Sequence, residues 1–319
     1  MTEFPIDTSG DSRFSRALPG WQIKLNSSSL GPFKLCPRKY YYSVVCGLET
    51  EARSVHLTFG SLVHAASAKY DALRASGEAH EVALREVTRL LMLATWDKEL
   101  SRGWVSGDGI KNRLSLLRTV VWYLDNYAGC DPAETVKLPS GGLAVELPFE
   151  FDSGFARSST GERVEFIGTL DKIIKLNDYY FVRDIKTTGG GLGEYFFRYF
   201  TPGNQFSLYL AAARICFDFD CEGVIVDGIQ VGAGFARFER AQAPRPKGVI
   251  EEWLEDSHEW IDAMQTCALR EHWPQNDMSC GAFGGCEFRS ICSASPKARA
   301  TWLAKGWKKR TSVGQEDVL

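Results

Sequence analysis

The feature of the sequence that most limits the possible folds is a pair of strand-like segments, 164–176 and 179–187. Both segments are rich in β-branched and aromatic residues, and only Asn177 and Asp178 separate them. A two-residue link of this kind closes a tight β-hairpin. The sequence therefore predicts an antiparallel hairpin around which the rest of the chain is arranged.

Charged side chains lie at one end of this hairpin. Successive side chains of a strand point to opposite faces, so Asp184 and Lys186 share one face and Ile185 points the other way, into apolar packing. If Asp171 on the partner strand shares that face, two carboxylates and an ammonium group converge. Such a site suits a hard divalent cation, which prefers oxygen ligands. The alternative is a solvated strand face with an ordinary salt bridge.

The segments around the hairpin alternate between helical and strand periodicity. This pattern predicts an α/β protein with a mixed, twisted central sheet flanked by helices and with a helical lobe before the sheet. The expected helices begin at Ser27 and Thr58 and cover 78–100, 111–127, 205–211 and 249–269; the other expected strands are 145–152, 223–231 and 233–239.

The pattern also predicts how the chain is organised. Residues 1–20 are polar and lack periodicity, so we expect a flexible arm there. A single domain over 21–300 follows, and 301–319 form a tail. Within the domain we expect a helical lobe at about 65–130, a sheet at about 143–242 and a cysteine-containing loop at 280–292.

Composition limits the compartment and the class of partner. The net charge is -3 and 24% of residues are charged, so a nucleic-acid site would have to be a local basic patch. No run of residues approaches the length of a membrane span, and the N-terminus does not read as a secretory signal. We therefore expect a cytoplasmic protein without membrane contact, whose thiols stay reduced.

Three of the nine cysteines are grouped in a way that packing does not require. Cys280, Cys286 and Cys292 follow one another at five-residue gaps in a glycine-rich segment. A tetrahedral ion or a cluster needs a fourth ligand, and Cys36, which precedes a proline, is the best candidate. Structural zinc normally uses closer cysteine pairs, so a 4Fe-4S cluster is favoured. Zinc and unliganded buried cysteines are the alternatives.

Several other residues are candidates for binding. His64 lies on the helix that starts at Thr58, where a single histidine is usually satisfied or exposed. Gln205 and Tyr209 are four residues apart and share a helical face. The basic and aromatic residues that follow Cys36 suit either a nucleic acid or half-buried packing. These residues are Arg38, Lys39 and the tyrosines that include Tyr41.

Together these motifs resemble the RecB-type branch of the PD-(D/E)XK nucleases, and within it the iron-sulfur group that includes the AddB nuclease domain and the CRISPR adaptation nucleases. The resemblance covers about 27–292 and depends on the order and spacing of the motifs. Leu170 stands where the literal motif has a proline before the aspartate. The motifs are Gly60-x-x-x-His64, Gly168-x-x-Asp171, Asp184-x-Lys186, Gln205-x-x-x-Tyr209 and the cysteine triplet.

The resemblance implies a restriction-endonuclease-like core and a role for each matching residue. Lys186 would orient or activate the attacking water and offset charge on the phosphate. Gln205 and Tyr209 would line the DNA path. The implied cation ligands are His64, Asp171, Asp184 and the Ile185 carbonyl, and the implied cluster ligands are Cys36, Cys280, Cys286 and Cys292.

The expected function is therefore hydrolysis of DNA phosphodiester bonds with Mg2+ or Mn2+. We expect an exonuclease that acts on single-stranded DNA ends in repair, recombination or phage DNA processing, with a helicase or recombination partner. Glu146 is a candidate outer carboxylate of the site. The main alternative is a non-catalytic DNA-end-binding iron-sulfur subunit of a larger nuclease-helicase complex, and a third possibility is a nuclease with a structural zinc.

Overall fold

A computed structural model describes residues 6, 8–50, 55–98, 101–104, 109–282 and 285–309 of the chain. The chain divides into two compact units, each built from segments that are far apart in the sequence. Unit 1 comprises 1–53, 149–168 and 247–312, and unit 2 comprises 54–148, 169–246 and 313–319. The single domain expected over 21–300 stays a prediction, and two strands have residues in both units.

The predicted hairpin is confirmed. Strands β7 (Glu165–Leu176) and β8 (Tyr179–Thr188) pair antiparallel, with Leu176 opposite Tyr179. Asn177, in the link, has φ of 54°. Asn tolerates this left-handed conformation better than most residues do, which explains a two-residue turn at this point.

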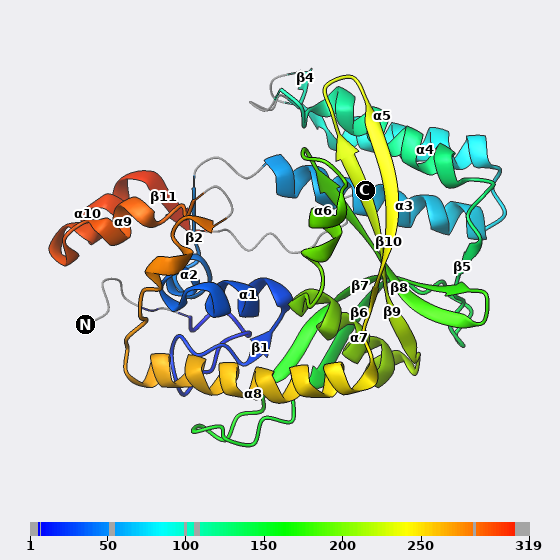
Figure 1. Cartoon of the computed structure of the whole chain (residues 1–319). Helices are drawn as coiled ribbons and strands as arrows, with labels where there is room; N and C mark the ends of the chain where they lie inside the picture. Colours follow the sequence, from blue (N-terminus) through cyan, green and yellow to red (C-terminus); the bar gives the residue numbers. More distant parts are fainter. Residues whose placement is uncertain are drawn as a thin grey trace. The chain divides into compact units, whose positions relative to one another are not determined.

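The hairpin lies in a mixed sheet, as predicted (Figure 1). In unit 2, β8 pairs in parallel with β9 (Cys221–Val231), and β9 pairs antiparallel with β10 (Ala236–Pro244). On its other edge β7 pairs with β5 (Ala133–Thr135) and β6 (Val145–Asp152). The first residues of β7 belong to unit 1, where they pair with β1 (Lys24–Leu25).

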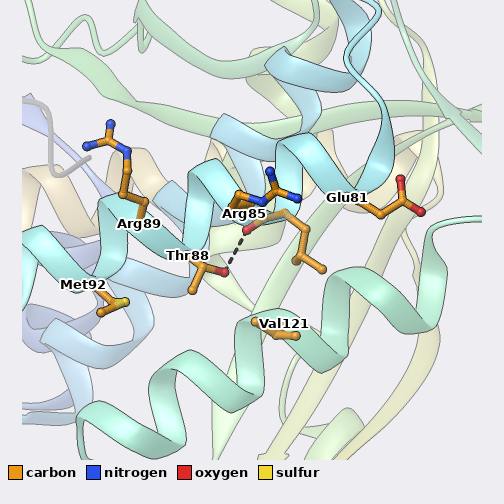
Figure 2. A pocket seen from close by; sticks show the side chains of 7 residues that line it. Glu81, Arg85, Thr88, Arg89, Met92 and Val121 are labelled. Atoms are coloured by element: carbon orange, nitrogen blue, oxygen red, sulfur yellow. Dashed lines mark hydrogen bonds between the residues drawn. The ribbon is translucent and has the colours of Figure 1, made fainter.

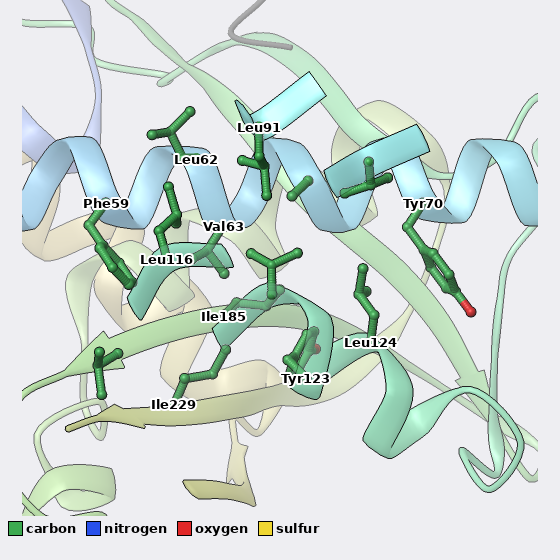
Figure 3. Packing of buried hydrophobic residues seen from close by; sticks show 14 of the residues in the cluster. Phe59, Leu62, Val63, Tyr70, Leu91, Leu116, Tyr123, Leu124, Ile185 and Ile229 are labelled. Atoms are coloured by element: carbon green, nitrogen blue, oxygen red, sulfur yellow. The ribbon is translucent and has the colours of Figure 1, made fainter. Parts of the chain in front are cut away.

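Three helices of unit 2 cover one face of its strands. They are α3 (Val55–Ala75), α4 (His80–Ala94) and α5 (Arg113–Tyr127). Figure 3 shows Leu62 and Val63 of α3 packed with Leu116 of α5, Ile185 of β8 and Ile229 of β9. Ile185 therefore points into apolar packing, as strand alternation predicts.

The remaining elements belong to one unit each. Unit 2 also holds β3 (Trp96–Asp97), β4 (Arg102–Gly103), α6 (Glu194–Arg198) and α7 (Asn204–Phe217). Unit 1 holds α1 (Ser27–Leu35), α2 (Pro37–Tyr40), a π-helix (Tyr41–Val45), β2 (Leu48–Thr50), α8 (Lys247–Leu269), a 3-10 turn (Asp277–Ser279), α9 (Arg289–Ser293), α10 (Pro296–Gly306) and β11 (Trp307–Lys309). None of the described helices is long and apolar enough to cross a membrane.

Both expected chain ends differ from the prediction where the structure describes them. In the expected arm, Phe14 bridges to Gln22 and is 3% exposed, and the Ser15 hydroxyl donates to Glu162. In the expected tail, α10 and β11 form and Leu303 is 1% exposed. A single buried residue such as Phe14 produces no periodic pattern of apolar residues, so the sequence gives no sign of its burial. Residues 1–5, 7 and 310–319 lie outside the described part.

A charged network ties the strands of unit 2 together away from the Asp184 side chain. Arg183 donates to Asp131 at 2.7 and 3.2 Å, and Arg240 donates to Asp131 at 3.0 Å and to Asp227 at 2.5 Å. The Tyr123 hydroxyl of α5 donates to Asp227 at 2.6 Å. Burial raises the pKa of Asp131, but the hydrogen bonds from the two arginines lower it more, so its pKa is well below the ordinary value.

This network predicts an acid-sensitive contribution to stability. Asp131→Asn should lower the free energy of unfolding by about 3 kcal/mol at pH 7, because two largely buried guanidinium groups lose a charged partner. The folded-state pKa of Asp131 lies below its unfolded value of about 3.9, so the stabilisation is complete above roughly pH 4 and is lost as the pH falls below that value. Urea unfolding of both proteins at pH 7, 4 and 3 measures this difference. A gap that stays constant over this range would contradict the prediction.

Candidate functional site

The two aspartates of the hairpin face each other. Lys172 of β7 lies opposite Arg183 of β8, and continuing this register by one residue puts Asp171 opposite Asp184. The Asp184 side chain is 0% exposed and that of Asp171 is 18% exposed. Two carboxylates this close and this buried repel each other when both are ionised, so the site needs positive charge.

Two cationic side chains supply that charge. His64, from α3, places Nδ1 at 3.0 Å from Oδ2 of Asp171. Lys186, two residues after Asp184 on the same strand face, places Nζ at 2.8 and 2.7 Å from its two carboxylate oxygens. The structure thus brings His64, Asp171, Asp184 and Lys186 together within unit 2, as the sequence motifs require.

Burial and charge separate the pKa values of the two acids. Burial raises the pKa of Asp184 to about 7, and the nearby Asp171 adds to this rise while Lys186 opposes it. Burial also acts to raise the pKa of Asp171, but the charge and hydrogen bond of His64 lower it to about 2. Burial lowers the pKa of His64, and Asp171 overcomes this effect and raises it to about 9. Asp171 and His64 therefore form an ion pair.

The carboxylate oxygens retain unused acceptor capacity. Oδ2 of Asp171 and Oδ2 of Asp184 are both buried, and each faces a cationic partner, His64 at 3.0 Å and Lys186 at 2.7 Å, without a hydrogen bond of good geometry. Two buried carboxylates this close cost free energy, which a bound divalent cation would offset. The donor chemistry therefore fits a hard divalent ion. Across the described residues, however, no three His, Cys, Asp or Glu side chains are already arranged around one ion position, so metal binding would have to displace the present ion pairs.

Helix α7 covers this site with polar and aromatic side chains. Gln205 donates from Nε2 to the Tyr209 hydroxyl at 2.8 Å, which confirms that the two share a helical face. Burial raises the pKa of Tyr209, and the charges of Asp171 and Asp184 raise it further, so the phenol stays protonated. The Lys186 ammonium lies 5.7 Å from the centre of the Phe206 ring.

A small cleft opens beside Asp171, and Glu146 of β6 is part of its wall. Glu146 has φ of 48°, a conformation that costs a non-glycine residue free energy. Burial raises the pKa of Glu146, and the charge of Asp171 raises it further, so its carboxyl group senses the site. The cleft is lined by His64, Ser67, Ala68, Val145, Glu146, Asp171, Lys172, Arg183 and Ile185.

Lys172 and Arg183 of this cleft belong to none of the sequence motifs. Lys172 forms an ion pair with Asp71, two turns along α3 from His64, and Arg183 pairs with Asp131. Strand alternation could have predicted that both cations point to the face opposite Asp184. It could not have predicted their partners, Asp71 and Asp131, which come from segments far away in the sequence.

A second hollow lies between α4 and α5, away from these acids (Figure 2). Its floor is mainly apolar, and Thr88 donates to a backbone carbonyl rather than facing a ligand group. It contains no pair of acids and no nucleophile next to a base, so it does not offer the chemistry of the cleft. Its lining residues are Glu81, Leu84, Arg85, Thr88, Arg89, Met92 and Val121.

The predicted DNA-binding residues near Cys36 make contacts within unit 1. Arg38 donates from Nε to the Trp273 carbonyl at 2.7 Å, and Lys39 forms an ion pair with Glu287 at 3.1 Å. Tyr41 is 3% exposed and its ring stacks on Trp273, with the ring centres 5.8 Å apart. The packing alternative therefore accounts for the position of Tyr41, and its binding to DNA stays a prediction.

The four candidate cluster cysteines share one neighbourhood in unit 1. Asn276 donates its backbone N–H to Cys36 Sγ at 3.4 Å, and Cys280 Sγ lies 3.9 Å from the Asn276 carbonyl. Cys286 donates its backbone N–H to the Cys280 carbonyl at 3.0 Å. Burial raises the pKa of Cys292 to about 11, and the charges of Cys286 and Cys36 also act on it. Among the described residues of this region, which exclude 283 and 284, no three of these side chains are positioned around a single metal ion.

Comparisons with known proteins identify the family to which the chain is similar. A family model described as "PD-(D/E)XK nuclease superfamily" matches residues 24–293. A "Putative exonuclease" from Eubacterium rectale is 11% identical with a TM-score of 0.46, over 87% of this chain and 92% of that one. SSO0001 is 16% identical with a TM-score of 0.34, over 85% and 86%. Both structures are too distant to inform the chemistry, and no curated protein matches.

The burial of Asp184 predicts a strong dependence on its lysine. In metal-free protein at pH 8, Lys186→Met should lower the free energy of unfolding by about 3 kcal/mol, because it leaves a buried carboxylate without its cation. The loss should be smaller at pH 6, where Asp184, with its pKa raised to about 7, takes up a proton.

The double variant Lys186→Met/Asp184→Asn is the matched control. It has no buried charge at this position, so it should recover most of the stability that the single variant loses. Urea unfolding of the four proteins in this cycle measures the coupling. A double variant as unstable as Lys186→Met would mean that the ion pair is not the cause.

Proposed function

The chain belongs to the PD-(D/E)XK nuclease superfamily, and we propose that it is a Mg2+- or Mn2+-dependent deoxyribonuclease that shortens single-stranded DNA from its ends. The observation that best supports the proposal is the meeting of two buried carboxylates, Asp171 and Asp184, beside the Lys186 ammonium, which lies 2.7 Å from Oδ2 of Asp184. Oxygen ligands beside a lysine suit a hydrolysis that develops negative charge on a phosphate.

In this proposal Asp171, Asp184, His64 and the Ile185 carbonyl hold the cation. When bound, a divalent ion makes a coordinated water more acidic and neutralises charge on the phosphate. The residues of the chain position the ligands of this ion. Packing of the Ile185 side chain in the apolar cluster fixes the strand, so the carbonyl of this residue is held in place.

Lys186 has a further role at the reacting phosphate. Its ammonium is held beside Asp184 and is 24% exposed, so it can reach a substrate without leaving the strand. It would orient the attacking water and stabilise the developing oxyanion. Gln205 and Tyr209, joined by their hydrogen bond, would line the path of the DNA strand beside it.

The proposed substrate and pathway are based on the family resemblance. Preference for single-stranded ends, and a role in repair, recombination or phage DNA processing with a helicase or recombination partner, rest on the resemblance to RecB-type nucleases. The same resemblance supports a structural 4Fe-4S cluster held by Cys36, Cys280, Cys286 and Cys292, with zinc as the alternative. The thiols of Cys36 and Cys280 both contact Asn276, which fits a clip between distant parts of unit 1.

The proposal predicts metal-dependent cleavage of DNA. Purified protein should degrade end-labelled single-stranded oligonucleotides with Mg2+ or Mn2+ and not without a divalent cation. Asp184→Ala and Lys186→Ala should each lower the rate at least about a hundredfold, because each removes a group that acts on the cation or the developing charge. Gel assays with 5′- and 3′-blocked substrates measure the rate and the polarity together.

Lys175→Ala is the matched control for Lys186. Lys175 lies on the same hairpin and is 46% exposed, with only a 4.0 Å contact to Asp178, so its loss should leave the rate unchanged. A wild-type protein that binds DNA ends and never cuts them, with any metal, would favour the non-catalytic end-binding subunit.

The cluster proposal predicts a specific metal content. Protein purified without oxygen should contain about four iron and four sulfide per chain, and Cys286→Ser should lose most of both. Cys130→Ser should keep them, because Cys130 is exposed and lies in unit 2. Iron, sulfide and zinc analysis decides the matter: zinc without sulfide would establish the alternative.

A further inference from the structure

Exposed aromatic rings of unit 2 are paired with arginines along helix α5. Trp96 is 46% exposed with the Arg113 guanidinium 5.8 Å from its ring centre. Trp122 is 44% exposed with Arg118 at 5.6 Å. Both arginines belong to α5, but they are five residues apart and therefore point about 140° apart around the helix, so the Trp96 pair lies on another side of α5 than the Trp122 pair.

A third pair continues the surface around Trp122 onto the sheet. Arg118 donates to the carbonyls of Gly232 at 2.6 Å and Ala233 at 3.0 Å, which ties the turn between β9 and β10 to α5. The turn carries Phe235, which is 41% exposed and has the Arg237 guanidinium 5.1 Å from its ring centre. Figure 1 shows this turn beside α5.

The arginines of these pairs keep their positive charge uncompensated. Arg113 donates to the Thr95 hydroxyl and the Met92 carbonyl, and Arg118 donates to carbonyls, all of which are neutral acceptors. Among the described residues neither arginine, nor Arg237, has a carboxylate within ion-pair distance, in contrast to Arg183 and Arg240. Uncompensated cations beside ring faces suit a ligand with both negative charge and flat apolar groups.

We propose that the surface formed by Arg118, Trp122, Phe235 and Arg237 binds single-stranded DNA outside the cleft. Bases would stack on the exposed ring faces while the arginines meet phosphates, the combination by which proteins bind single strands without sequence preference. A duplex keeps its bases stacked inside and could use only the charges. The inference rests on the proposed function, since it assigns a binding path to the same substrate.

The test measures binding without cleavage. Full-length protein without divalent cations is titrated into fluorescein-labelled dT20, and anisotropy gives the dissociation constant. Trp122→Ala and Phe235→Ala should each weaken binding by about five- to fiftyfold, because each removes one stacking platform. Trp122→Phe keeps a ring and should retain most of the affinity. Arg237→Gln should lower the slope of log Kd against log salt by about 0.7.

Leu114→Ala is the matched control. Leu114 lies on the same helix and is 76% exposed, but it has no ring, so DNA binding should be unchanged. Circular dichroism and thermal unfolding confirm that each variant is folded. If the surface instead docks another copy of the chain, Leu114→Ala and Trp122→Ala should both abolish self-association in light scattering and leave dT20 binding intact, which would overturn the inference.

Failure of the inference and failure of the proposed function give different results. Wild-type protein that binds and degrades dT20, with folded Trp122→Ala and Phe235→Ala variants that bind it equally well, overturns the inference alone. Wild-type protein that does not bind dT20 at 50 mM salt overturns this surface and the single-stranded substrate together.

Discussion

Two acids placed opposite each other on adjacent buried strands determine the chemistry of this protein. Asp171 and Asp184 cannot both be ionised in a buried site without nearby positive charge, and the fold brings His64 and Lys186 to them. In these ion pairs one fully buried oxygen of each acid lies beside its cationic partner without good hydrogen-bond geometry. Two buried acids this close cost free energy in the free protein, which a bound cation would offset.

The rest of unit 2 keeps these side chains in register. A slip of one residue between β7 and β8 would turn Asp184 and Lys186 to the opposite face, so the register must be held from several sides. Ile185 is buried in the cluster beneath α3 and α5, while Arg183 is fixed by Asp131. The candidate metal ligand Asp184 and the network residue Arg183 are thus adjacent on one strand, on opposite faces, and depend on the same pairing.

How much could be predicted from the sequence depended on whether a feature is local. The hairpin, the shared face of Asp184 and Lys186 and the contact of Gln205 with Tyr209 follow from periodicity and were predicted correctly. The role of His64 beside Asp171 was predicted only from the family resemblance, because the two residues are more than a hundred positions apart in the sequence. The Asp131 network and the burial of Tyr41 depend on packing between distant segments, which leaves no local pattern. For the same reason the order in residues 8–20 was missed.

A crystal structure with Mn2+, with its anomalous scattering mapped, tests the central claim most directly. The account predicts one strong peak in contact with the side chains of both Asp171 and Asp184, with the His64–Asp171 ion pair broken, and no peak in crystals of Asp184→Asn. A manganese peak elsewhere in the molecule, or none in the wild type while Lys186 remains paired with Asp184, would contradict the claim that these two acids form the metal site.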